Sequence, residues 1–294
     1  MIVFLIALGL GIVAVLALSW QIPEPGTMRQ PRTGDFLPAG SPLDLPQEIR
    51  EDALATAGAA HRHDRQKQLR LAADMLATYR EVKDTDIFIL FNSGGYGWSN
   101  LDKSPGYATI MDAIEDILGK KGFRVKVLSY QRAYRGWRDY VGEILNAGAK
   151  SIAKPKELAL RLSFLLRHLP DLQIVLTSES NGTVMSNQVM RLLPEEPRLF
   201  SIEFGPPFWY QTFLNDRILN MRSNGRVPDA FSYGHWRRAI AANIGAAFGR
   251  SEQAPGKVLL YIGAPGHDYN WHDYPLIQER IRLFLDRHFP GSSA

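Results

Sequence analysis

The sequence predicts an α/β protein with a mostly parallel, doubly wound sheet, on the basis of its apolar runs and the stretches between them. Runs of consecutive apolar, β-favouring residues recur along the chain, the clearest being Ile-Phe-Ile-Leu-Phe at 87–91. A strand buried on both faces needs continuous hydrophobicity of this kind, as in a parallel sheet covered by helices. The expected strands are Ile87–Phe91, Val125–Leu128, Leu172–Leu176, Leu199–Phe204, Ile218–Met221 and Val258–Ile262.

Helix-like stretches alternate with these runs, and this alternation is the second observation that predicts the fold class. The last of them places Ile277, Ile281 and Phe284 on one face. The expected helices are Tyr107–Lys121, Asp139–Asn146 with Pro155–His168, Thr183–Leu193, Tyr233–Phe248 and Leu276–Phe289. In doubly wound sheets the active residues lie in the loops just beyond the carboxyl ends of the strands.

The N-terminus predicts a membrane segment. Residues 2–18 are apolar residues and glycines only, and Met1–Trp20 would span about 30 Å as a helix, the thickness of a bilayer core. An uncleaved transmembrane anchor over residues 1–20 is favoured over a cleaved signal peptide, because no positive residue opens the segment. Arg29 and Arg32 follow it, which favours a cytoplasmic location for the body of the protein.

Two further segments precede the body of the protein, which is expected to span residues 84–294. Residues 21–47 are rich in Pro, Gly and polar residues and are expected to form a tether. Residues 48–83 are expected to be helical and partly basic, with Leu69, Ala72, Leu76 and Tyr79 on one face. An ordinary packing helix is the favoured interpretation of this segment, and a basic amphipathic helix on anionic lipid is the alternative.

The composition excludes several functional classes. The chain has 294 residues, no cysteine and a net charge of +4 without a clustered basic run. The lack of cysteine excludes disulfides, zinc–thiolate sites and a cysteine nucleophile, and the weak charge bias argues against a nucleic-acid partner. His267 and His272, each followed by Asp, lack further ligands at matching spacing, so no metal and no cofactor are expected.

The most informative loop follows the expected strand Leu172–Leu176. Its sequence is Thr-Ser-Glu-Ser-Asn-Gly at 177–182, and Ser180 has the small residues Ser178 and Gly182 two positions away on each side. A serine with small flanks between a strand and a helix is the pattern of a nucleophile elbow, in which the next backbone N–H, here that of Asn181, can bind an oxyanion. An ordinary turn that caps the helix is the alternative interpretation.

Two other loops fit the same chemistry. Ser93 and Gly94 follow the strand Ile87–Phe91 in a Gly-rich loop, where a second oxyanion donor is expected. His267 follows the strand Val258–Ile262 and can act as the general base for Ser180, with His272 as the alternative base.

The order of oxyanion loop, nucleophile elbow and terminal Gly-His resembles the α/β-hydrolase superfamily over roughly Asp86–Phe289. That resemblance implies Ser180 as nucleophile, His267 as base and a lid-like insertion at about 205–233. The superfamily places an acid three residues before the Val of a Val-Pro pair, but here Asn224 precedes Val227-Pro228 at that spacing. Asp229 is the first candidate for the acid.

Aromatic residues are frequent in the same loops. Tyr96, Trp98, Phe208, Trp209 and Tyr210 are expected to line an apolar substrate pocket, or alternatively to fill the small core of a lid. The sequence therefore predicts a membrane-tethered serine hydrolase that cleaves an ester of a hydrophobic acyl substrate, such as a lipid. The alternative is a catalytically silent domain of the same fold that binds a protein partner at a membrane, because the expected acid position holds Asn224.

Overall fold

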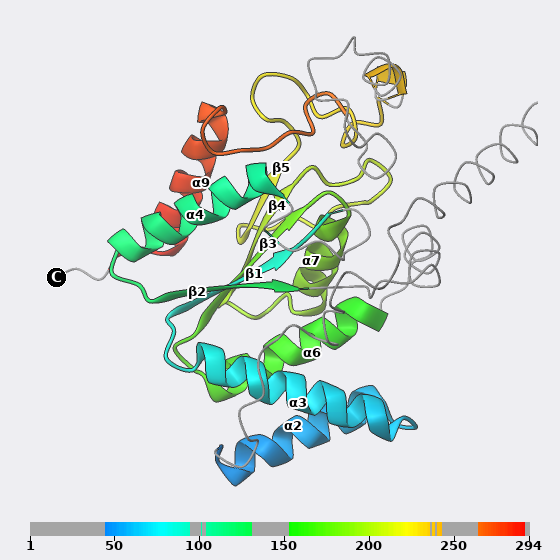
Figure 1. Ribbon diagram of the computed structural model, residues 1–294, viewed down its shortest axis with the longest axis vertical. Coiled ribbons are helices and arrows are strands. Elements are labelled where there is room, and N and C mark those ends of the chain that lie inside the picture. Colours follow the sequence, from blue (N-terminus) through cyan, green and yellow to red (C-terminus); the bar gives the residue numbers. More distant parts are fainter. Residues whose placement is uncertain are drawn as a thin grey trace, which may run out of the picture.

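The computed structural model describes residues 45–94, 101, 104–130, 153–235, 237–238, 240–242 and 264–291. Its centre is a five-stranded sheet with the order β2-β1-β3-β4-β5, and every neighbouring pair is parallel (Figure 1). The strands are β1 (Ile87–Asn92), β2 (Val125–Tyr130), β3 (Gln173–Glu179), β4 (Leu199–Phe204) and β5 (Ile218–Met221). The prediction of a parallel α/β sheet is confirmed, while the expected strand Val258–Ile262 lies outside the described residues.

Helices cover both faces of the sheet. On one face lie α4 (Pro105–Lys120) and α9 (Pro275–His288), and on the other lie α6 (Ala153–His168) and α7 (Asn181–Leu192) (Figure 1). In β1 the residues Ile87, Ile89 and Phe91 pack with the α4/α9 side, and Phe88 and Leu90 pack with the α6/α7 side. All five are fully buried. Successive side chains of a strand point to opposite faces, so burial on both faces explains the unbroken apolar run.

The first described segment is divided into two helices, α2 (Gln47–Ala60) and α3 (Arg65–Val82). The break precedes α3, where the Asp64 carboxylate accepts a hydrogen bond from the Lys67 amide at 3.0 Å and so caps the new helix. The buried face of α3 includes Leu71, Ala72, Met75 and Leu76, whereas Leu69 is 47% exposed, so the expected face was wrong at that residue. Both helices share a hydrophobic cluster with α6 and the sheet.

The chain path creates a switch point between β1 and β3. From β1 the chain passes through α4 to β2 on one side, and from β2 it passes through α6 to β3 on the other side of β1. The carboxyl ends of β1 and β3 are direct neighbours, with Asn92 paired to Ser178. In open α/β sheets a ligand crevice forms outside the carboxyl ends of two neighbouring strands whose connections leave in opposite directions.

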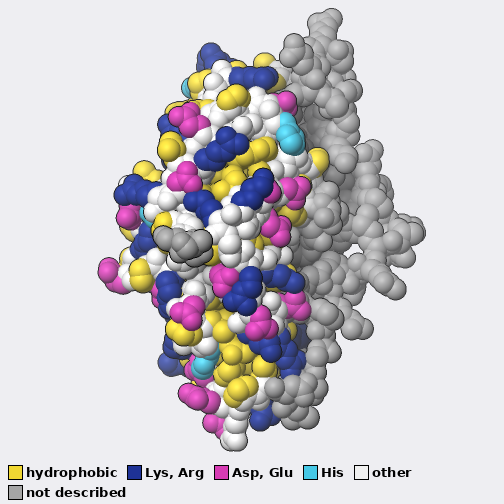
Figure 2. All heavy atoms as spheres, turned by 90° about the vertical axis from the view of Figure 1, so that its left-hand side faces the viewer, with side chains coloured by type: hydrophobic (Ala, Val, Ile, Leu, Met, Phe, Trp, Pro, Cys, Tyr) yellow, Lys and Arg dark blue, Asp and Glu magenta, His cyan; other side chains and the backbone are white. Residues whose placement is uncertain are grey.

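The stretch expected as a lid-like insertion, residues 205–233, contains β5, a strand of the sheet. It is therefore not a single insertion but two connections, one before and one after β5. Figure 2 shows the face that carries α4 and α9, where Lys and Arg side chains are interspersed with Asp and Glu. No stripe of a single sign covers this face, which fits the modest net charge of +4.

The N-terminal segments expected as anchor and tether lie outside the described residues up to position 44, and so does the expected helix Asp139–Asn146. Of the expected helix Tyr233–Phe248, residues 237–238 and 240–242 are described and are helical, but residues 233–234 belong to a turn, so the expected start at Tyr233 was wrong. Among the helices that the structure describes, none has the length and apolar character needed to cross a bilayer.

Candidate active site

Ser180 occupies a strained turn between β3 and α7. It has φ 50° and ψ −125°, and it is the only non-glycine residue with positive φ in the described part of the chain. Its amide donates to the Phe204 carbonyl at 2.8 Å, and its carbonyl accepts from the Thr183 hydroxyl at 2.7 Å. These bonds hold a conformation that costs of order 1–3 kcal/mol, which matches the sharp strand-to-helix turn of a nucleophile elbow.

Steric contacts explain why the residue two positions after Ser180 is a glycine, Gly182. A Cβ built on Gly182 would lie 2.2 Å from the Asn92 carbonyl oxygen and 2.7 Å from that of Ser93. The first turn of α7 therefore lies directly against the end of β1, and any side chain at 182 would push the helix away. On the other flank, Ser178 is fully buried between β1 and β4.

His267 is bound to a carboxylate, that of Asp229. The imidazole Nδ1 lies 2.7 Å from Asp229 Oδ2, which also accepts from the Tyr269 hydroxyl at 2.6 Å and the Ser232 hydroxyl at 3.0 Å. The other oxygen, Oδ1, accepts from the amides of Phe231 at 2.8 Å and Ser232 at 3.1 Å. Asp229 thus accepts five hydrogen bonds while its side chain is fully buried.

These contacts determine the charge state of Asp229. Burial by itself would raise the pKa of this carboxyl, but the hydrogen bond and charge of His267 and the hydrogen bonds from Tyr269 and Ser232 outweigh burial. The net pKa lies below the usual range of an aspartate. The carboxylate is therefore ionised at neutral pH, and His267 Nδ1–H is the donor, which leaves Nε2 on the opposite edge of the ring.

Gly205 brings this pair to the serine. Its φ is +63°, and a Cβ built on it would lie 2.5 Å from His267 Cε1 and 2.9 Å from Asp229 Oδ2. The imidazole thus packs on the Gly205 backbone, one residue after the Phe204 carbonyl that holds the Ser180 amide. The His267–Asp229 pair therefore lies at the carboxyl end of β4, the strand whose last carbonyl binds the Ser180 amide.

Asn224 does not contact His267. Its Oδ1 accepts from the amides of Arg226 at 3.0 Å and Val227 at 3.1 Å, and its Nδ2 donates to the Asp268 carbonyl at 3.2 Å. The residue closes a turn in which Ser223 bridges to Pro228 and the Asp229 amide returns to the Arg222 carbonyl at 3.1 Å. This turn brings the carboxylate to the imidazole from a position five residues later than the expected spacing.

The loop after β1 contacts the nucleophile, although one of its residues differs from the expected role. A Cβ built on Gly94 would lie 3.2 Å from Ser180 Cβ, so the loop passes directly beside the serine. The Gly94 amide, however, donates to Glu179 Oε1 at 3.2 Å. Gly94 is therefore not the oxyanion donor that we expected, because its N–H already has a carboxylate acceptor. Asn181 and the fully buried Ser93 stay predictions for that role.

An aromatic series connects the surface to the imidazole. Phe208 and Trp209 are 51% and 48% exposed, and their ring centroids are 5.0 Å apart. Trp209 lies 5.1 Å from Phe231, whose ring lies 4.9 Å from that of His267. Of the five predicted pocket residues, Phe208 and Trp209 are thus connected to His267 through Phe231, while Tyr96 and Trp98 lie outside the described residues.

The fifth predicted pocket residue, Tyr210, belongs to a buried network that the sequence analysis missed. Its hydroxyl donates to Asn187 Oδ1 at 3.1 Å, and the Asn187 amide group donates to Glu203 Oε1 at 3.0 Å. Glu203, on β4, also accepts from Asn220 at 2.8 Å and Ser201 at 3.1 Å. Burial raises the pKa of Glu203 to about 7. The sequence did carry a signal for this network, because Glu203 is a charged residue inside Leu199–Phe204, a run expected to be a buried strand.

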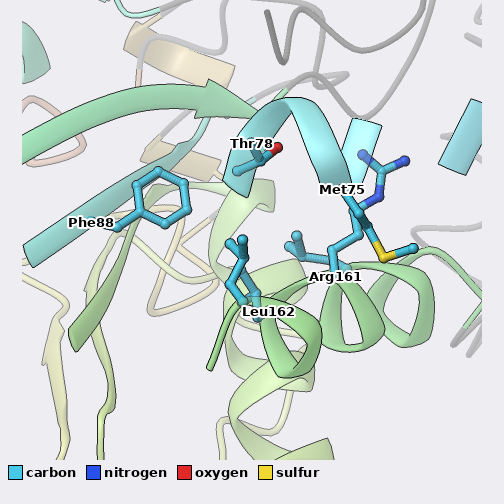
Figure 3. A pocket seen from close by; sticks show the side chains of 7 residues that line it. Met75, Thr78, Phe88, Arg161 and Leu162 are labelled. Atoms are coloured by element: carbon cyan, nitrogen blue, oxygen red, sulfur yellow. The ribbon is translucent and has the colours of Figure 1, made fainter. Parts of the chain in front are cut away.

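A small cavity lies elsewhere in the molecule (Figure 3). Residues of α3, α6 and β1 line it, among them Met75, Arg161, Leu162 and Phe88. The volume in which the centre of a water molecule could lie is about 10 Å³. That is room for about one water, not for a substrate. Phe88 is the second residue of β1, so the cavity is near the opposite end of the strand from Ser93. Within the described ranges no group of three His, Asp or Glu side chains could hold a metal.

Comparisons with known proteins add little to this geometry. No family model matches the sequence, and no curated protein matches it. Among solved structures, Trichoderma reesei cutinase in complex with a C11Y4 phosphonate inhibitor is similar with 13% identity and a TM-score of 0.33, over 66% of this chain and 88% of the cutinase. Similarity at this level carries no argument about activity, so functional assignment rests on the site.

Proposed function

We propose that the protein is a serine hydrolase of the α/β-hydrolase type that cleaves an ester of a hydrophobic acyl substrate. The observation that supports this proposal most strongly is the bond between His267 and the buried Asp229, placed on Gly205 beside the strained turn of Ser180. A buried carboxylate of this kind suits a general base, since it orients the imidazole and stabilises the imidazolium.

The reaction proceeds in two halves. Ser180 Oγ attacks the ester carbonyl carbon while His267 Nε2 takes its proton, and the charged oxygen is held by the amides of Asn181 and Ser93. The tetrahedral intermediate collapses, the bond to the alcohol breaks, and the alcohol leaves with the proton from His267. Water then attacks the acyl-serine in the same way, its proton passing through His267 to Ser180, and the carboxylic acid is released.

The aromatic series at the site supports a hydrophobic acyl group. Phe208 and Trp209 remain about half exposed at the outer end of the series that runs through Phe231 to His267, where an acyl chain could cover them. A lipid ester fits this surface and also fits the proposed anchor in residues 1–20, with the body of the protein on the cytoplasmic side.

Labelling with a fluorophosphonate probe tests the proposal. The wild type, solubilised in detergent, is expected to be labelled, Ser180→Ala not at all, and His267→Ala at a strongly reduced rate, because the probe reacts only with an activated serine. The absence of labelling of the folded wild type between mildly acid and mildly alkaline pH would reject the hydrolase and favour the silent binding domain. Activity on short soluble esters but on no long-chain ester would reject only the lipid substrate.

A further inference from the structure

The residue before the candidate nucleophile is a glutamate with an unexpected set of contacts. Glu179 Oε1 accepts from the Gly94 amide at 3.2 Å and from the Ser104 hydroxyl at 2.8 Å. Ser104 is the residue from which α4 starts, and Gly94 belongs to the loop after β1. One carboxylate oxygen of Glu179 therefore links the loop beside Ser180 to the N-terminus of α4.

A negative charge at this position opposes the proposed chemistry. The tetrahedral intermediate develops a negative oxygen near the Asn181 and Ser93 amides, and a carboxylate close to it would repel that charge. The Ser104 hydroxyl and the positive end of the α4 dipole offset part of the repulsion. Since the charge itself does not help the reaction, we look for the role of Glu179 in its hydrogen bonds to Gly94 and Ser104.

The contacts leave the loop little freedom. A Cβ on Gly94 would lie 3.1 Å from Glu179 Cγ and 3.2 Å from Ser180 Cβ, so the loop backbone is in close contact with both residues. The Gly94 amide shares a peptide unit with the Ser93 carbonyl, and the Ser93 N–H, a proposed oxyanion donor, lies one residue before it. A hydrogen bond at the Gly94 amide therefore restrains the backbone of Ser93, and with it the direction of the Ser93 N–H.

The first turns of α4 contact the other two parts of the site as well. The Tyr107 hydroxyl donates to the Ser178 carbonyl at 3.0 Å, within the elbow. The Thr109 hydroxyl accepts from the Trp271 amide at 2.9 Å, in the loop that contains His267. Because α4 contacts the elbow and the histidine loop directly, Glu179 connects the remaining loop to the same rigid element.

We infer that Glu179 is a positioning residue of the reaction, which acts through Gly94 to hold the oxyanion loop against Ser180. This inference rests on the proposed hydrolase function. The carboxylate works here as a hydrogen-bond acceptor, not as a charge. A neutral side chain with an acceptor oxygen in the same place should therefore replace it.

Three variants test this inference in the full-length protein. Glu179→Ala removes the acceptor, Glu179→Gln keeps an acceptor oxygen without the charge, and Glu279→Ala removes an exposed glutamate of α9 as the matched control. The second-order rate of fluorophosphonate labelling, kcat and KM on a short-chain p-nitrophenyl ester, and hydrogen exchange of the Gly94 amide are measured for each. Thermal unfolding checks that each variant is folded.

Glu179→Ala is expected to lower the labelling rate and kcat about 10- to 100-fold with little change in KM, because a misplaced donor is lost mainly from the transition state. Exchange at Gly94 should become faster in the same variant. Glu179→Gln should stay within about threefold of the wild type in both measurements, and Glu279→Ala should match the wild type. The rescue by Gln separates loop positioning from an effect of charge.

Two results would overturn the inference: a Glu179→Ala variant that matches the wild type in labelling and exchange, or a Glu179→Gln variant as impaired as Glu179→Ala. Failure of the proposed function has a different signature, since the folded wild type itself would then not be labelled. In that case the exchange of Gly94 still decides whether Glu179 holds the loop, and unchanged exchange in Glu179→Ala would reject it.

Discussion

The two halves of the candidate site are built differently. The serine half lies at the junction of β3 and α7, in a short stretch of consecutive residues where Thr183 bonds back to the Ser180 carbonyl. The acid–base half joins Asp229 and His267, which are 38 residues apart and lie in irregular segments after β5 and before α9. A turn between regular elements follows local rules, whereas a bond between two loops requires the fold around it.

This difference predicts how each half fails. The serine half should be sensitive to small steric changes, because helix, strand and loop backbones meet there at van der Waals distance. The acid–base half should be sensitive to the loss of single hydrogen bonds, because five of them hold one buried carboxylate.

The largest effect is expected from Asp229→Asn. The amide cannot stabilise the imidazolium and favours the wrong tautomer of His267, so kcat should fall by about 10⁴-fold. The measurement is kcat on a short-chain ester, with Asn224→Ala as the control. Asn224 holds its own turn and donates to the Asp268 carbonyl, but it forms no hydrogen bond with the imidazole, and its loss should lower kcat by less than about tenfold. Equal losses in the two variants would contradict the assignment of Asp229.

Gly182→Ala should disturb the serine half. The added Cβ would lie 2.2 Å from the Asn92 carbonyl oxygen, so α7 must shift, which we expect to cost about 1–3 kcal/mol of unfolding free energy and to slow labelling of Ser180. Gly119→Ala in α4 is the matched control, since nothing lies within 4 Å of its Cβ. That variant should be up to about 1 kcal/mol more stable than the wild type. Urea unfolding measures both, and a neutral Gly182→Ala would show that the helix has room.

Tyr269→Phe should have an intermediate effect on the acid–base half. It removes one donor from Asp229 Oδ2 and leaves the bond to His267 in place. We expect kcat to fall about tenfold, which corresponds to about 1.4 kcal/mol and is at the lower end for a hydrogen bond to a charged group. Tyr274→Phe is the control, because its hydroxyl binds Asp268 instead. A kcat that falls equally in both variants would argue for a general loss of packing.

Glu203 should contribute the smallest effect, seen in the pH dependence of stability. Its pKa is raised to about 7 by burial, so the folded state holds the proton more tightly than the unfolded chain. Stability from this group is full below its usual pKa, near 4.5, and is lost as the pH rises through 7. In the wild type this group makes the unfolding free energy fall with pH between these values, by at most about 1.4 kcal/mol per pH unit. Glu203→Gln should remove that decline.

The control for Glu203→Gln is Asp171→Asn, which changes an exposed carboxyl in the loop before β3. Urea unfolding at a series of pH values should give the wild-type slope for this control. A Glu203→Gln protein with an unchanged slope would show that the carboxyl does not take up a proton in this range.

Much of the fold followed from the sequence. The runs at 87–91 and 199–204 marked β1 and β4, because strands buried on both faces allow only apolar side chains at nearly every position. The turn at Ser180 was also visible, since its small flanking residues lie within two positions of the serine, although the contacts that require Gly182 come from the end of β1. The face of α3 was less predictable, because Leu69 fits the helical period yet is 47% exposed.

The tertiary structure decided which side chains meet. By sequence Asn224 held the expected acid position and Asp229 was the first candidate for the acid, and the turn from Ser223 to Pro228 is what brings Asp229 to His267. Likewise, the bond from Gly94 to Glu179 and the network around Glu203 join residues from different strands, helices and loops. Local patterns report the backbone that a segment prefers and the faces it buries, whereas the pairing of polar groups distant in sequence depends on how those segments pack.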